Sequence, residues 1–461
     1  MLSSLSKIDK NMDFTHGSIY NKLLIFSVPL LLGNLLQQIY FIADSVIVGQ
    51  LIGSNALGAV GAATSITILL IFFFQGVASG AGILISQYIG AGEPYKMKKV
   101  IKASSLFTIF FGVIFSVVGF LLTENILQWI SVPKEVFHQT YMYLAVSFLG
   151  MLPMLIYNMG AAILQAMGDS KTPLYYLAVA SVINIVLDIY FVKNLGMNVE
   201  GTAIATVIAQ AVSAALIFIS ITKKSKYIGK AAATIKDDSK LINILKHMLV
   251  IGIPIGVQSI VINFSNIITQ NHINGIGPDA MAGWSIFSRI DTFVILPFIS
   301  FGIAVTTYVG QNYGAQNMER IFKGVKAGMI MSVGVTVGIG AIICFTAKYI
   351  FLCFTSEPAV IDYACDMIWH MVPFYFMLAS AKVHSSAVSG TGNSIVPMII
   401  NILFMCVIRV ILIPTFSHTI GHNMTALYLT YLISWILNAV SICLYYEFKT
   451  KKQLKEQSSM V

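Results

Sequence analysis

The feature that most constrains the fold is a series of twelve apolar runs. A helix needs about 20 such residues to cross a hydrocarbon core, and backbone inside a bilayer must form its own hydrogen bonds. Only 10% of the residues are charged, against about 25% in soluble domains. The sequence therefore predicts an all-α protein with twelve transmembrane helices, near residues 22–50, 56–88, 100–123, 138–165, 173–192, 200–221, 245–273, 279–310, 322–345, 362–388, 396–415 and 424–446.

Basic residues gather on one side of these runs. The two tails and the second, fourth, sixth and eighth loops carry nearly all of the lysines, whereas the opposite loops offer only Lys134, Lys193 and Lys348. Because lysine and arginine mark cytoplasmic loops, we expect a multi-pass plasma-membrane protein with both termini in the cytoplasm. The net charge of +9 belongs to these loops, so we expect the lipid bilayer, and no nucleic acid, as a partner.

The two halves of the chain repeat each other. The longest polar break, residues 223–244, separates an amino-terminal lobe (1–222) from a carboxy-terminal lobe (245–461). A shift of 224 residues aligns "QYIGAG" with "QNYGAQ", "IGSNALGA" with "IGPDAMAG" and "MGDSKTP" with "TGNSIVP". Each lobe has six predicted spans, an even number, so both lobes enter the membrane from the same side. We expect a pseudo-two-fold axis along the membrane normal, with the substrate path between the lobes.

Three acidic residues lie deep in predicted spans: Asp44, Asp188 and Asp291. A carboxylate in hydrocarbon is costly unless it is protonated, paired or bound to an ion. Asn184 precedes Asp188 by four residues and shares its helical face, and Thr206 on the next span can add a hydroxyl. These oxygens predict a binding site for a proton or a hard cation, with Na⁺ at Asp44 and Asp188. The alternative is that they only hydrogen-bond helices together.

The second half lacks this acid pair. The 224-residue shift places Ile268 opposite Asp44 and Leu412 opposite Asp188, so ion binding is expected in the first half only. We expect pairing through neighbouring helices to join Arg289, Asp291 and Arg409 in a structural polar cluster. Two further deep groups, Lys382 and His384, are expected near the site or the substrate cavity, with Lys382 opposite Asn158. Two states of the buried lysine stay open: it is neutral, or it faces a water-filled cavity.

Pro29 and Gly33 lie in the first predicted span, upstream of Asp44. Proline removes a backbone hydrogen bond and weakens a helix, and glycine adds backbone freedom. Three interpretations stay open: the start of the helix, a fixed kink, or a moving hinge. Pro254 opens the seventh run in a similar way.

Together these residues resemble the multidrug and toxic compound extrusion (MATE) family over about residues 15–448. The similarity rests on "VP" followed by "ADSVIVG", on "NIVLD", and on the paired "QYIGAG" and "QNYGAQ" loops. It implies a monomeric antiporter that expels organic cations in exchange for H⁺ or Na⁺. It places ion coupling at Asp44, Asn184, Asp188 and Thr206, adds Tyr143 and Asn158 near that site, and assigns bending to Pro29. Another branch uses a seventh-span glutamate and a tenth-span aspartate, which are absent here.

Other functions remain as alternatives. A lipid-linked oligosaccharide flippase would need a cationic cavity, and Lys382, Arg289 and Arg409 are candidates for one. A channel would not need an ion-linked carboxylate pair. An enzyme is not expected, because the chain has no HExxH, nucleophile elbow or catalytic Cys/His set. No cofactor is expected beyond the coupling ion.

Overall fold

Helices form almost all of the protein. The structure, a computed structural model, describes residues 13–231, 240–421 and 423–459, and 91% of it is helical. Two compact units divide the chain, one containing Val28–Gly256 and the other Phe14–Ser27 and Val257–Val461. Two helices are divided between the units. The first turns of α2 (Ile19–Leu51) belong to the second unit, and the first turns of α9 (Leu241–Ile276) belong to the first unit.

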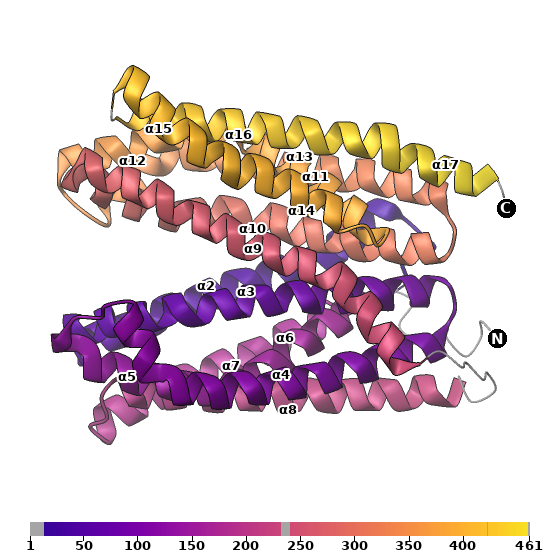
Figure 1. Cartoon of the computed structure of the whole chain (residues 1–461), viewed down its shortest axis with the longest axis horizontal. Coiled ribbons are helices and arrows are strands. Elements are labelled where there is room, and N and C mark those ends of the chain that lie inside the picture. The colour runs from indigo at the N-terminus through magenta and orange to yellow at the C-terminus, as the bar shows by residue number, and fades with distance from the viewer. Residues whose placement is uncertain (1–12, 232–239, 422, 460–461) are drawn as a thin grey trace. The chain divides into compact units, whose positions relative to one another are not determined.

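The remaining helices follow in chain order (Figure 1). The first unit contains α3 (Ser54–Gly90), α4 (Pro94–Trp129), α5 (Lys134–Leu149), α6 (Met151–Ala166), α7 (Lys171–Ile189), the π-helical turn η2 (Tyr190–Asn194) and α8 (Val199–Ala231). The second contains α10 (Pro278–Gly314), α11 (Met318–Leu352), α12 (Pro358–Met371), η3 (Val372–Phe374), α13 (Tyr375–Gly390), α14 (Ile395–Ile402), η4 (Leu403–Val407), α15 (Ile408–Ile420), α16 (Met424–Tyr445), η5 (Tyr446–Thr450) and α17 (Lys451–Ser459).

Within the described ranges, ten helices are long and apolar enough to cross a membrane. An eleventh span results if α5 and α6 are taken together, since they are bent by 50° at a break. Gly150 occupies this break, because Val207 of α8 leaves no room there for a side chain. The predicted span at 362–388 is divided into α12, η3 and α13, where Pro373 lacks the N–H of a continuous helix.

The predicted linker at 223–244 is largely helical where it is described. Helix α8 continues to Ala231, and α9 begins at Leu241. Residues 232–239 of the linker and residues 1–12 of the amino-terminal tail lie outside the described residues. The lobe limits at 222 and 245 and the cytoplasmic position of the termini stay predictions.

The internal repeat is visible in the backbone. Gly53 (φ 122°) precedes α3, and Gly277 (φ 144°), 224 residues later, precedes α10. The turns after these two helices also correspond, since Gly92 and Gln316 both have positive φ, 67° and 56°. A positive φ strains a residue with a side chain, so Gln316 keeps a conformation for which Gly92 is better suited.

Small residues let α3 and the first part of α9 touch backbone to backbone within the first unit. Gly76 and Gly80 of α3 lie against Gly252 and Gly256 of α9. A Cβ added to Gly80 would lie 2.6 Å from the carbonyl oxygen of Met248 and 2.7 Å from Cα of Gly252. This is the small-xxx-small arrangement that allows membrane helices to approach closely.

We therefore expect Gly80→Ala to destabilise the protein, because the new methyl group meets backbone that cannot move aside. Overpacking of this kind costs roughly 1–3 kcal/mol. Gly58→Ala on the same helix is the matched control, since nothing lies within 4 Å of its added Cβ; it should be neutral or stabilising by up to about 1 kcal/mol. Thermal unfolding in detergent measures both. Equal melting temperatures for the two variants would contradict the close helix crossing.

Candidate functional site

The four residues predicted to bind a proton or ion meet inside the first unit. Asp44 of α2 is only 7% exposed, and Asn184 and Asp188 of α7 are fully buried. The Asn184 amide donates a hydrogen bond to Oγ1 of Thr206 on α8, 3.1 Å away. The carboxyl groups of Asp44 and Asp188 are close enough for their charges to interact. Three helices thus bring the four side chains together.

Sequence reasoning missed Tyr40, which belongs to the same group. Its hydroxyl lies 3.2 Å from Oγ1 of Thr206. The signal was present in the sequence, because Tyr40 precedes Asp44 by one helical turn and must share its face. Tyr143 of α5, placed near the site by family resemblance, also lies close to Asp44 and Asp188.

Several acceptor oxygens in this group have no hydrogen-bond donor. Within the described residues, no hydrogen-bond partner reaches the buried carboxylate oxygens of Asp188, Oδ1 of Asp44 or Oδ1 of Asn184. A buried acceptor left unpaired is unfavourable by about 1–3 kcal/mol, and more when it is charged. Carboxylate, amide and hydroxyl oxygens are the ligands that hard cations prefer, and a shared proton would also satisfy a carboxylate pair. The side chains therefore fit H⁺ or Na⁺.

A cavity of about 480 Å³ in the first unit opens onto this group. Its lining includes Tyr40, Asp44, Tyr143, Asn158 and Thr206, whereas Asn184 and Asp188 are not among the lining residues. Asp44 is therefore the carboxylate that meets the cavity. As far as the described residues go, the lining contains no lysine, arginine or second acid. It includes Met151 and Met154, whose flexible side chains adapt to different shapes.

Pro29 lies inside α2, ten residues after the helix begins at Ile19. One of the three interpretations of this proline, that it starts the helix, is therefore wrong: the helix continues without interruption through a position where proline removes one backbone hydrogen bond. The boundary between the two compact units passes through the same place, between Ser27 and Val28. Gly33 is in loose contact with Leu174, so a Cβ there would fit at 3.8 Å.

The charged residues that were predicted to form a polar cluster in the second unit have other partners in the structure. Asp291 accepts a hydrogen bond from the Tyr375 hydroxyl. Across residues 13–231, 240–421 and 423–459 no ion pair joins Asp291 to Arg289 or Arg409. Arg289 is exposed, whereas Asp291 is half-buried. The predicted ion pairing of Asp291 is therefore wrong, because its partner is the Tyr375 hydroxyl.

Arg409 is buried and stacks on an aromatic ring. Its guanidinium lies 4.1 Å from the centre of the Tyr431 ring, a cation–π contact that partly compensates for lost hydration. Its Nε has no hydrogen-bond partner among the residues that the structure describes. Lys382 and His384 lie on α13 of the second unit, and their predicted position near a substrate cavity stays a prediction.

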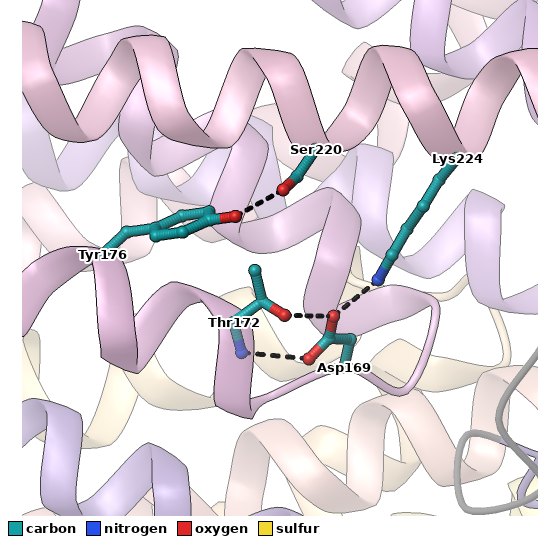
Figure 2. Close-up of polar contacts among 5 residues, drawn as sticks. All are labelled: Asp169, Thr172, Tyr176, Ser220 and Lys224. Carbon is teal, nitrogen blue, oxygen red and sulfur yellow. Dashed lines mark hydrogen bonds and ion pairs between the residues drawn. The ribbon is translucent and has the colours of Figure 1, made fainter.

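A polar network at one end of α7 and α8 holds the two helices together (Figure 2). Asp169 lies in the turn before α7 and accepts hydrogen bonds from the backbone and hydroxyl of Thr172, at 3.0 and 2.6 Å. Lys224 of α8 reaches the same carboxylate at 2.5 Å. One turn further along, the hydroxyls of Tyr176 and Ser220 are 2.5 Å apart. The network fixes the helices that carry Asn184, Asp188 and Thr206.

The comparison that decides the family is a match to the MatE family model at residues 29–190 and again at 254–415. The chain belongs to the MatE family. The two matches begin at Pro29 and Pro254, in agreement with the internal repeat. Together with the long apolar helices, membership identifies this MatE protein as a multi-pass membrane protein.

Curated relatives and solved structures agree with this assignment. The MatE chain is 28% identical over 97% of its length to the "Probable multidrug resistance protein YpnP" of Bacillus subtilis, of which it covers 99%. It is 25% identical over 77% of its length to the "Multidrug export protein MepA" of Staphylococcus saprophyticus, of which it covers 78%. A solved structure described as the outward-facing conformation of a multidrug resistance MATE family transporter has the same fold, with a TM-score of 0.89 at 21% identity, covering 97% of this chain and 99% of that one.

The Asp169 network predicts a pH-dependent contribution to the stability of this MatE protein. Burial raises the pKa of Asp169, but hydrogen bonds from Lys224 and Thr172 outweigh it and hold the pKa below its ordinary value. A lowered folded-state pKa means that stability is present above the unfolded-state pKa, about 3.9, and is lost as the pH falls through the folded-state value. Asp169→Asn should therefore destabilise the protein at pH 7 and flatten the acid limb of its stability curve.

The expected loss at pH 7 is roughly 1.5–3 kcal/mol, as for a hydrogen bond to a charged group. The matched control is Glu93→Gln, which removes a half-exposed carboxylate paired with Lys96 at 2.9 Å and should change stability by less than about 1 kcal/mol. Melting temperatures between pH 3 and pH 8 test both. Parallel pH curves for wild type and Asp169→Asn would show that the ion pair contributes nothing.

Proposed function

We propose that the protein is a secondary active antiporter that exports organic cations and drugs in exchange for H⁺ or Na⁺. The observation that carries this proposal is the buried Asp44–Asp188 pair, whose Asp44 lines the 480 Å³ cavity. Relatives named for multidrug resistance and multidrug export support the substrate class. An acid and aromatic rings in one cavity attract organic cations through charge and cation–π contacts.

The twelve-helix arrangement is part of the same proposal. We take the α5–α6 pair and the α12–α13 pair each as one interrupted span, which adds two spans to the ten uninterrupted ones. Two six-helix lobes would then be related by a pseudo-two-fold axis along the membrane normal, and alternating access would occur between them. We further propose that the protein works as a monomer in the plasma membrane, with both termini in the cytoplasm.

The coupling mechanism follows from electrostatic repulsion. Two adjacent carboxylates repel each other when both are charged, and a proton or a cation between them removes that repulsion. Asn184 and Thr206, joined by their hydrogen bond, would supply further oxygens to the ion. Ion binding moves a protein only if it favours one conformation over another. Here it would draw α2 toward α7 and α8 and change the cavity that Asp44 lines.

The flippase alternative has less support from this cavity. A lipid-linked pyrophosphate requires positive charge, and among the residues that the structure describes Asp44 is the only charged one that lines the first-unit cavity. Transport of a fluorescent organic cation, compared with that of a lipid-linked oligosaccharide, separates the two functions.

Asp44→Asn and Asp188→Asn should each abolish gradient-driven efflux, because one carboxylate beside an amide lacks the charge repulsion that binding of a proton or cation relieves. The measurement is uptake of a fluorescent cation into proteoliposomes, with H⁺ and Na⁺ gradients imposed separately. Asp362→Asn is the control, since this carboxylate is exposed on α12 and should transport as the wild type does. Wild-type coupling in both core variants would overturn the assignment.

Pro29→Ala should slow turnover while leaving ion affinity nearly unchanged. Alanine restores the missing backbone hydrogen bond inside α2 and makes bending there more difficult. Ion affinity and transport rate are measured on one preparation, with Pro254→Ala on α9 as the comparison in the repeat. If Pro29→Ala turns over at the wild-type rate, the proline is a fixed kink and the movable segment lies elsewhere.

A further inference from the structure

A second hollow in the first unit lies apart from the acidic cavity. It has a volume of about 230 Å³ between α4, α6 and α8 and shares no lining residue with the cavity at Asp44. Its walls are mostly apolar, and Lys98 contributes to its lining near the start of α4. We refer to it as the α4–α6–α8 groove.

The groove faces the position that lipid would occupy. Ile109 of α4 and Phe218 of α8 line it and are 46% and 57% exposed on membrane-length helices. Exposed large apolar side chains on such helices contact hydrocarbon rather than water. The groove is therefore accessible from the side, to a molecule that is already in the bilayer.

The internal repeat places larger side chains at positions that line the groove in this half. The 224-residue shift places Met329 opposite Ser105 and His384 opposite Gly160. In the second unit these larger side chains occupy the corresponding space: Ser380 contacts Met329 at 3.9 Å, and the His384 ring packs edge-on against Tyr446 at 5.3 Å. Tyr446 itself stands where the first half has Thr222.

Glycine at position 160 is required by packing as well. A Cβ there would lie 2.8 Å from a methyl group of Ile217 on α8, so the close approach of α6 and α8 leaves the floor of the groove without a side chain.

The charge at the end of the groove indicates what kind of molecule binds. Lys98 is exposed, and in the described part of the chain it has no ion-pair partner, whereas its neighbour Lys96 pairs with Glu93. The repeat position opposite Lys98 is Phe322, so the second half has an aromatic ring where the first half has this lysine. A free ammonium at the end of a narrow apolar groove is complementary to an anionic head attached to a hydrocarbon chain.

We propose that the α4–α6–α8 groove binds one anionic phospholipid, with an acyl chain between the three helices and the phosphate at Lys98. In the orientation proposed above, this lipid comes from the cytoplasmic leaflet. Anionic head groups are attracted to basic residues at that surface. The site does not depend on the transported substrate or on the coupling ion, so it can be tested without a transport assay.

The test is native mass spectrometry of the full chain, purified in detergent and offered equal amounts of phosphatidylglycerol and phosphatidylcholine with the same acyl chains. The wild type should retain phosphatidylglycerol preferentially. Lys98→Gln should reduce that preference roughly fivefold, the effect of losing one charge contact at a membrane surface. Lys134→Gln removes an exposed lysine at the other end of the first unit's helices and should leave the preference unchanged.

A second variant tests the groove itself. Ser105→Met introduces the residue found at the repeat position and should reduce retention of both lipids, since it fills the space for the acyl chain without altering charge. Melting temperature checks that each variant is folded. Equal retention of the two lipids by the wild type, the same loss in Lys98→Gln and Lys134→Gln, or undiminished retention by a folded Ser105→Met would overturn the proposal.

Discussion

The carboxylates of Asp44 and Asp188, which lie together among membrane-length helices, are the main constraint on the structure of the first unit. Asp188 is fully buried, and in the part of the chain that the structure describes neither of its oxygens has a donor; Asp44 adds a third unpaired oxygen. Water does not relieve this arrangement in hydrocarbon, so the bundle must hold the pair in place while leaving a route for a proton or cation. The hydrogen bond between Asn184 and Thr206 and the network around Asp169 hold α7 against α8. The cavity at Asp44 provides the route.

The two halves of the repeat share backbone conformations but differ in their functional side chains. The positive φ angles at Gly53 and Gly277 show that both halves use the same turn before their longest helices. The side chains at equivalent positions have diverged, since Ile268 replaces Asp44 and His384 replaces Gly160. One scaffold therefore carries an acid pair and an open groove in its first half, and an aromatic, basic interior in its second.

In the described part of the second unit, Asp291 and Arg409 are held among the helices without an ion pair to each other. Asp291 accepts from the Tyr375 hydroxyl, and Arg409 lies over the Tyr431 ring. Both tyrosines pack against Trp435. A polar contact and a cation–π contact each supply part of the solvation that water would give. Sequence reasoning assigned these charges to one another, because a pattern of charges along a chain does not reveal which aromatic rings lie between them.

The sequence by itself determined the fold class, the helical spans as apolar segments, the duplication and the residues of the acid pair. Inside a bilayer only a few backbone structures are possible, and an unpaired charge is unfavourable. Long apolar runs are therefore reliable signals of spans, and the rare acidic residues within them are reliable signals of a functional site. It did not determine where helices break or which side chains meet. The 50° break at Gly150, the continuity of α2 through Pro29 and the partner of Asp291 depend on neighbouring helices. So does the α4–α6–α8 groove, which exists because Gly160 and Ser105 leave space that only packing in three dimensions encloses.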